Sequence, residues 1–217
     1  MKNKMKSLIV IVFIFFIYQI NANSDEFNFE GEEIIILDEG NRLLSKNGVK
    51  ITTSDNLIFE SNEFEYDKTK LELILSDNVI ITDTKKNLII KTDKIKYKKK
   101  EEKLISDNIT EININNNYTI KSNNIFFDRK NGFLSSDEKT SITDTRQNQL
   151  LTNEFRFYIK DQLIKARNAK IKDEFGNSTF LESFIGTLHD NQFYGKDVKI
   201  NFNNNTFGNL DNDPRLY

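Results

Sequence analysis

The chain lacks cysteine and tryptophan, and it has one histidine, one proline and eight glycines among 217 residues. Without cysteine it has neither disulfides nor thiolate metal ligands. With so little proline and glycine, asparagine and aspartate must shape the chain reversals, because both tolerate left-handed backbone and bond to their own main chain. The formal net charge of −2 offers no electrostatic basis for a nucleic-acid partner.

Sequence signals of catalysis are also lacking. The chain has no Gly-x-Ser-x-Gly nucleophile turn and no glycine-rich phosphate loop. The single histidine, His189, lies in a Leu-His-Asp-Asn string typical of a turn. Paired acids such as Glu63 and Glu65 fit a solvated face better than a glycosidase site. We therefore expect no catalytic residue, no cofactor and no metal site, and a protein that is not an enzyme.

What the chain does contain is a degenerate unit of about thirty residues, written roughly five times between Gly48 and Phe202. Asp77, Asp107 and Asp137 follow one another at intervals of 30 residues, with an aliphatic run, an aromatic run and a charged turn between them. A fixed period of this length predicts stacked supersecondary units, none of which buries its apolar face alone. Function would then belong to a surface that the units share.

The runs between the turns are β in character. Segments 49–52, 111–115 and 198–202 alternate apolar and polar residues, and no segment after Asn21 shows a convincing helical stripe. We expect an all-β fold whose terminal strands, in 27–29 and 34–37 at one end and in 198–202 at the other, leave edges open to strand addition. The apolar face forms either a packed core or a lipid-accessible groove, and the composition fits both.

The N-terminus indicates export. Three lysines precede an apolar run from Leu8 to Tyr18, and Ala22 offers a small residue for cleavage. This pattern is typical of a secretory signal peptide and is short for a spanning helix, although an uncleaved anchor remains the alternative. We expect a signal peptide at 1–22, a β domain at 23–207 and a linker at 208–217.

These residues carry a resemblance to a known family. Gly48-Val49-Lys50-Ile51 and Glu63-Phe64-Glu65-Tyr66-Asp67, with their repeats, resemble the OstA-type periplasmic domain of the lipopolysaccharide (LPS) transport proteins, over about residues 24–216. The ending Asn212-Asp213-Pro214-Arg215-Leu216 resembles the motif that follows the last periplasmic repeat of the LPS-assembly protein LptD. LptD itself continues into a large outer-membrane barrel, whereas this sequence stops at Tyr217, as a divided or truncated LptD would.

The resemblance implies an open, twisted β-jelly roll in the periplasm, associated with the outer membrane. Its apolar groove would shield the acyl chains of LPS and relay them without chemistry. Its partners would be LPS, other Lpt jelly rolls joined edge to edge, and an outer-membrane barrel or lipoprotein. The expected groove-lining residues are the alternating apolar residues of each unit: Ile58, Phe64, Tyr66, Leu88, Ile95, Tyr97, Ile120, Ile125, Phe127, Phe155 and Phe157.

Three alternatives remain at this point. The chain could be another bridge component, either soluble like LptA or anchored like LptC. It could instead be a β-solenoid adhesin or surface protein with a closed core. A solenoid polysaccharide enzyme would require acidic residues converging on one face.

Overall fold

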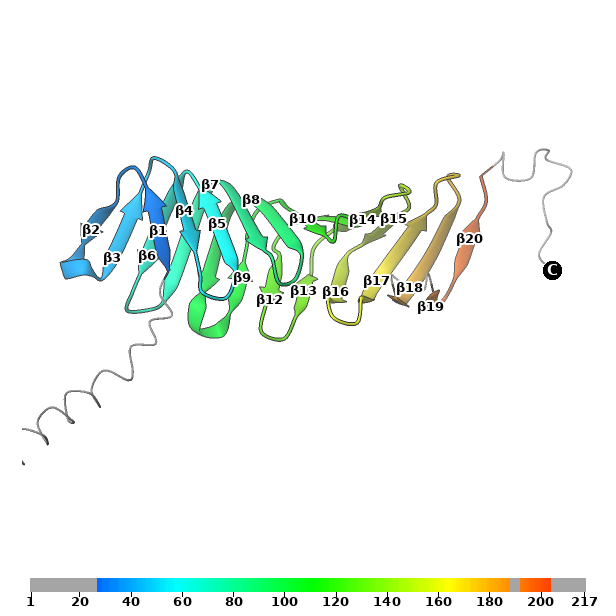
Figure 1. Cartoon of the computed structure of the whole chain (residues 1–217). Helices are drawn as coiled ribbons and strands as arrows, with labels where there is room; N and C mark the ends of the chain where they lie inside the picture. The colour runs from blue at the N-terminus through cyan, green and yellow to red at the C-terminus, as the bar shows by residue number, and fades with distance from the viewer. Residues whose placement is uncertain (1–26, 188–191, 204–217) are drawn as a thin grey trace, which may run out of the picture.

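The computed structural model describes residues 27–187 and 192–203, and these form twenty β-strands and two 3-10 turns (Figure 1). The expected signal peptide (1–22), His189 and the expected linker (208–217) lie outside the described residues. The strands are β1 (Asn28–Gly31), β2 (Ile35–Leu37), β3 (Arg42–Ser45), β4 (Val49–Thr52), β5 (Leu57–Ser61), β6 (Glu63–Asp67), β7 (Glu72–Asp83), β8 (Leu88–Lys98), β9 (Lys103–Ile105), β10 (Thr110–Ile114), β11 (Tyr118–Ser122), β12 (Phe126–Asp128), β13 (Phe133–Ser136), β14 (Thr140–Asp144), β15 (Gln149–Thr152), β16 (Glu154–Tyr158), β17 (Leu163–Lys172), β18 (Ser178–Thr187), β19 (Gln192–Lys196) and β20 (Lys199–Asn201).

The strands form two antiparallel layers that share four long strands. The first layer runs β2-β3-β6-β7-β8-β9-β12-β13-β16-β17-β18-β19, through the pairings on that side of the molecule. The second layer runs β1-β4-β5-β7-β8-β10-β11-β14-β15-β17-β18-β20. Every pairing in the described residues is antiparallel, which confirms the all-β prediction and excludes the parallel coil of a β-helix.

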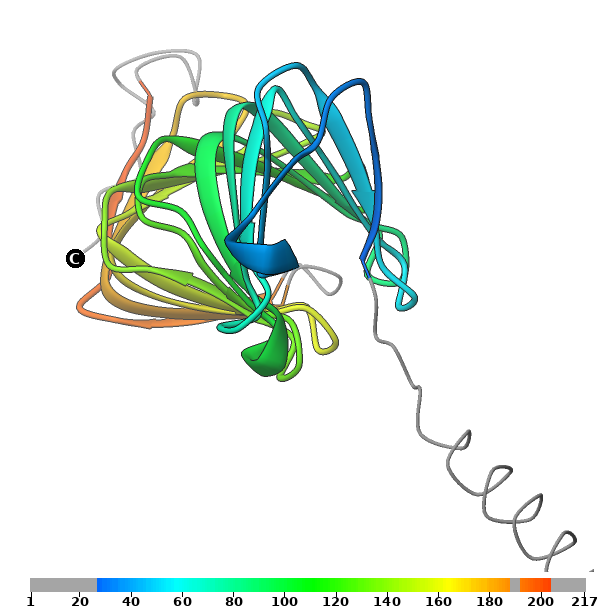
Figure 2. The same ribbon diagram turned by 90° about the vertical axis from the view of Figure 1, so that its left-hand side faces the viewer.

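Each thirty-residue unit supplies two strands to each layer, as β9, β10, β11 and β12 illustrate. Figure 1 shows the units stacked side by side along one axis, and Figure 2 looks along that axis and shows successive strands rotated about it. This rotation is the twist expected of β-sheets. The thirty-residue repeat of the sequence therefore corresponds to one passage of the chain from the first layer to the second and back.

We call the side on which the chain crosses between layers the seam, and Asp77, Asp107 and Asp137 all lie there. In β7 the pairing register shifts between Ser76 and Val79, where Asp77 and Asn78 have positive φ of 62° and 55°. Such backbone bends a strand from one layer into the other at low steric cost for Asp and Asn. At this crossing, Asp and Asn thus adopt the positive-φ backbone that glycine often adopts in other proteins.

Buried hydroxyl groups line the inner side of the seam. Thr110 is fully buried, and its Oγ1 contacts Ser106 Oγ at 2.6 Å and Thr92 Oγ1 at 3.1 Å. In the next unit Ser122 Oγ contacts Thr140 Oγ1 at 2.6 Å and donates to Ser136 Oγ at 3.0 Å. A buried hydroxyl must find a partner, and these partners link strands of both layers. Ser106 and Ser136, each of which directly precedes an aspartate of the repeat, therefore have a structural role at the seam.

Opposite the seam, hairpin turns of the two layers form two rims, and we call the space between them the mouth. Second-layer turns are capped by aspartates: Asp83 Oδ1 accepts the amides of Lys85 and Lys86 at 3.1 Å, and Asp173 Oδ1 accepts those of Phe175 and Asn177. Asp side chains stabilise such turns by replacing a backbone acceptor. The core lies between the seam and the mouth.

Candidate lipid-binding interior

Ten of the eleven residues expected to line a groove are buried between the two layers. They are Phe64, Tyr66, Leu88, Ile95, Tyr97, Ile120, Ile125, Phe127, Phe155 and Phe157. Their alternation with outward polar residues places them on the inner faces, as the sequence pattern predicts. Whether lipid contacts them stays a prediction, because each is packed against neighbours in this structure.

Ile58 is the exception, and the facing predicted for it is wrong. It is half-buried on the outer face of β5, while Leu57 and Phe59 on either side are fully buried. The run Leu57-Ile58-Phe59 is apolar at three successive positions, so the sequence fits either register. A slip by one residue sends every side chain of a strand to the other face.

An aromatic cluster fills the N-terminal half of the interior. Phe27, just before β1, lies 5.0 Å from Tyr66 and 6.2 Å from Tyr97 in the first layer, and 6.4 Å from Phe59 in the second, measured between ring centroids. All three contacts are edge-on, which is a favoured geometry of aromatic pairs. Lys99 Nζ lies 4.7 Å from the centroid of the Phe27 ring. In this half the interior is a packed core.

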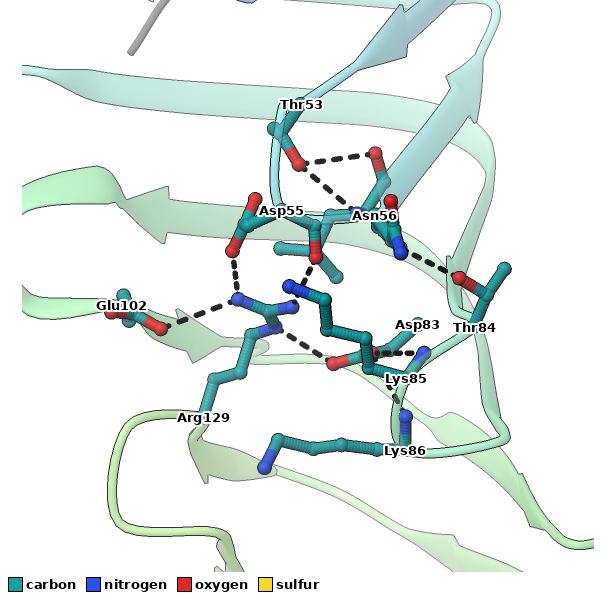
Figure 3. A network of polar contacts seen from close by, with 10 residues as sticks. Thr53, Asp55, Asn56, Asp83, Thr84, Lys85, Lys86, Glu102 and Arg129 are labelled. Carbon is teal, nitrogen blue, oxygen red and sulfur yellow. Dashed lines mark hydrogen bonds and ion pairs between the residues drawn. The ribbon is translucent and has the colours of Figure 1, made fainter. Parts of the chain in front are cut away.

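Arg129 closes the mouth over this core (Figure 3). It extends from the β12–β13 turn of the first layer, and its Nε donates to Asp83 Oδ2 at 2.7 Å in the second layer. Its Nη2 donates to the main-chain oxygen of Asp55 at 2.9 Å, and its Nη1 contacts the carboxylates of Asp55 and Glu102. Arg129 is 6% exposed and Asp83 is fully buried. One guanidinium thus joins three turns from both layers.

The charges of this network support one another. Partial burial raises the pKa of the Asp55 carboxyl, but the Thr53 hydrogen bond and the Arg129 guanidinium outweigh it, so the net pKa is lowered. Burial raises the pKa of the Tyr97 phenol, and the nearby Asp55 adds to the effect. The carboxylates of Asp55, Asp83 and Glu102 thus surround the Arg129 guanidinium with charge-assisted hydrogen bonds, which are stronger than hydrogen bonds between neutral groups.

The C-terminal half differs, because a cavity of about 420 Å³ lies between its layers. Its apolar lining comes from both layers: Tyr118, Ile142, Leu150 and Ile171 from the second, and Ile164, Phe184 and Phe193 from the first. Polar groups of Asp144, Arg146, Asn148 and Gln149 also line it. A mainly apolar cavity of this size with a few polar groups has the make-up of a site for an amphiphilic ligand.

None of the eleven expected residues lines this cavity. The missed residues show the same alternation in the later units, so the pattern was present in the sequence. Whether these residues line a cavity depends on the distance between the two layers. That distance is set by the whole stack, so the sequence of a single unit does not indicate it. Arg129 lies in a charged turn, Asp128-Arg129-Lys130-Asn131-Gly132, and nothing in this local sequence marks its side chain as buried.

The two ends of the stack carry the expected edges. Within the described residues, β1 pairs with β4 alone and β2 with β3 alone, while β19 and β20 pair with β18 alone. Large apolar side chains are exposed there, including Ile36 at 66%, Tyr194 at 71% and Val198 at 51%. Exposed apolar residues on an unpaired edge are typical of a surface that takes up another strand.

No protein-family model and no curated protein matches this chain. It is similar to a solved structure of LptH. That crystal structure is described as the LptA-homologous periplasmic component of the LPS transport device from Pseudomonas aeruginosa. The match has a TM-score of 0.30 and 9% identity, and it covers 69% of this chain and 99% of that chain.

Two further observations concern the described part of the chain. Its helical segments include none long and apolar enough to cross a membrane. It also contains no group of three or more His, Asp or Glu side chains placed to hold a metal ion.

Proposed function

We propose that this chain is a periplasmic LPS-transport component that binds acyl chains between its two layers and passes LPS toward the outer membrane without catalysis. The observation that carries this proposal is the cavity in the C-terminal half, which is apolar inside and has charged and amide groups in its lining. LPS combines acyl chains with an anionic polar part, and the cavity combines matching surfaces. Each methylene moved from water into it gains ~0.8 kcal/mol.

The proposal includes the division of the chain expected from its sequence. Residues 1–22 would act as the export signal, 23–207 as the jelly roll and 208–217 as a linker. The edge strands β1 and β2 at one end and β19 and β20 at the other would pair with other jelly rolls or with an outer-membrane partner. The sequence resemblance to the LptD N-terminal region and the two unpaired ends support this part.

Photo-crosslinking tests the cavity as the binding site. Phe193 lines the cavity, and its neighbour Tyr194 is 71% exposed and does not. A photoreactive phenylalanine analogue replaces either residue with little change of size. We expect purified LPS to be captured at position 193 and not at 194, because adjacent strand residues point to opposite faces. Equal capture at both positions, or at neither, would contradict the proposal.

A further inference from the structure

Arg129 occupies a position that recurs in four successive turns of the first-layer rim. The amides of Lys68, Lys99, Arg129 and Ile159 each donate to a carbonyl of the preceding turn, at 2.8, 3.0, 3.0 and 2.9 Å. The four residues are therefore structurally equivalent, yet their side chains behave differently. Lys68 is exposed, Lys99 lies over the Phe27 ring, and Ile159 packs against the core. Arg129 reaches the opposite layer.

The second-layer rim also differs from one turn to the next, at the position of Asp83. Following the register across the second layer, Asp83 is in line with Leu88, Ile114, Tyr118 and then Asp144. Asp83 accepts a hydrogen bond from Arg129, whereas Asp144 accepts the amides of Arg146 and Asn148 and the Asn148 side chain within its own turn. One unit along from Arg129 and Asp83, the equivalent positions are Ile159 in the first layer and Ile114 in the second. Both are apolar, so no ion pair like that of Arg129 and Asp83 forms there, and Asp144, one unit further, bonds within its own turn.

This difference coincides with the change in the interior. The layers are joined at the mouth where Arg129 stands, and the core beneath it, with Tyr97, Phe59 and Phe127, is filled. The cavity begins in the second layer at Tyr118, which is in line with Asp144. A buried cation held by carboxylates of both layers resists separation of those layers, because opening would leave Asp83 without its partner.

We propose that Arg129 sets how far an acyl chain extends along the interior, by holding the mouth shut over the N-terminal half and confining the chain to the C-terminal cavity. The inference rests on the proposed function, since it assumes that acyl chains enter between the layers. It adds a residue that determines which chain lengths are accommodated. With Arg129 in place, methylenes beyond the cavity stay in water and add no affinity.

A chain-length series tests this directly. Lysophosphatidylglycerols from octanoyl to stearoyl displace the fluorescent probe ANS from the intact protein, and their affinity should rise with length until the cavity is full. The test variant combines Arg129→Met with Asp83→Asn, so that no unpaired charge is buried and the Asp83→Asn amide oxygen still caps its turn. Lys130→Met, an exposed position in the same turn, is the matched control.

We expect the wild type and Lys130→Met to reach a plateau at the same chain length. In the double variant the plateau should move to longer chains, and the longest chain should bind on the order of tenfold more tightly than to the wild type. Binding with an unchanged plateau would overturn the role of Arg129 and leave the proposed function standing. Absence of binding to all three proteins would overturn both.

Spin labels provide a readout that does not depend on ligand affinity. The chain has no cysteine, so introduced cysteines are labelled uniquely. Ser54→Cys with Lys130→Cys joins the two rims beside Arg129. Thr145→Cys with Lys160→Cys joins a turn of each rim in the C-terminal half, and all four positions are exposed. The double variant should broaden the distance distribution of the first pair and leave the second unchanged. Identical distance distributions for the first pair with and without the substitutions would refute the proposal that Arg129 holds the two layers together.

Discussion

The Nε of Arg129 and the Oδ2 of Asp83 lie 2.7 Å apart although they belong to turns of opposite layers. Asp83 is fully buried and its other oxygen caps the turn between β7 and β8. The carboxylate is therefore bonded on both sides, to its own turn and to the facing layer. This one contact ties the local structure of a hairpin to the spacing of the two layers.

Removing the guanidinium alone should destabilise the protein strongly. Arg129→Met leaves the Asp83 carboxylate buried without its cation, which typically costs about 3–5 kcal/mol. Arg129→Met together with Asp83→Asn should cost less than the single substitution, because no buried charge is left. Urea unfolding followed by circular dichroism measures both. A double variant less stable than Arg129→Met would contradict this account.

Stability should fall in acid partly through Asp55. The pKa of Asp55 is lowered in the folded protein, so its contribution is present above the unfolded pKa of ~3.9 and is lost as pH falls through the folded value. Asp55→Asn should therefore reduce the loss of unfolding free energy between neutral pH and pH about 3. Asp93→Asn, at an exposed position on the seam, is the control. An unchanged pH profile in Asp55→Asn would rule out this contribution.

The seam should depend on its buried hydroxyls. Thr110→Val keeps the shape of the side chain but removes contacts to Ser106 and Thr92 and a hydrogen bond to the Asn108 carbonyl. Because buried partners lose their bonds, we expect a loss of about 1–3 kcal/mol in unfolding free energy. Thr119→Val, at a half-buried position of β11, should change it by within about 0.5 kcal/mol. Equal effects would show that the hydroxyl contacts contribute nothing.

Phe127 and its neighbour Phe126 separate core packing from lipid contact. Phe127 is fully buried, while Phe126 is half-buried on the outer face of β12. Phe127→Ala should lower the unfolding free energy by about 3–5 kcal/mol in the absence of any lipid, since it leaves a cavity. Phe126→Ala should lower it by clearly less. If Phe127→Ala were harmless without lipid, Phe127 would line an accessible groove and not the packed core.

The strand class and the repeat followed from the sequence because both are local. The alternation in 111–115 becomes β10 with the predicted facing, and Asp77, Asp107 and Asp137 occupy equivalent crossings on the seam. The predicted facing was wrong at Ile58, where the alternation is interrupted, because three apolar residues in succession fit either register. The unpaired ends were also predictable, since a stack of strands must end somewhere.

An all-β stack of thirty-residue units with apolar residues on an inner face could be predicted from local sequence, because strand period and turn preference are properties of neighbouring residues. Where that inner face is packed and where it encloses a cavity depends on contacts between residues far apart in the chain. Arg129 and Asp83 are 46 residues apart in the chain, and Ile142 and Phe184 face one cavity from different layers. Contacts of this kind depend on how the layers come together, which no local pattern specifies.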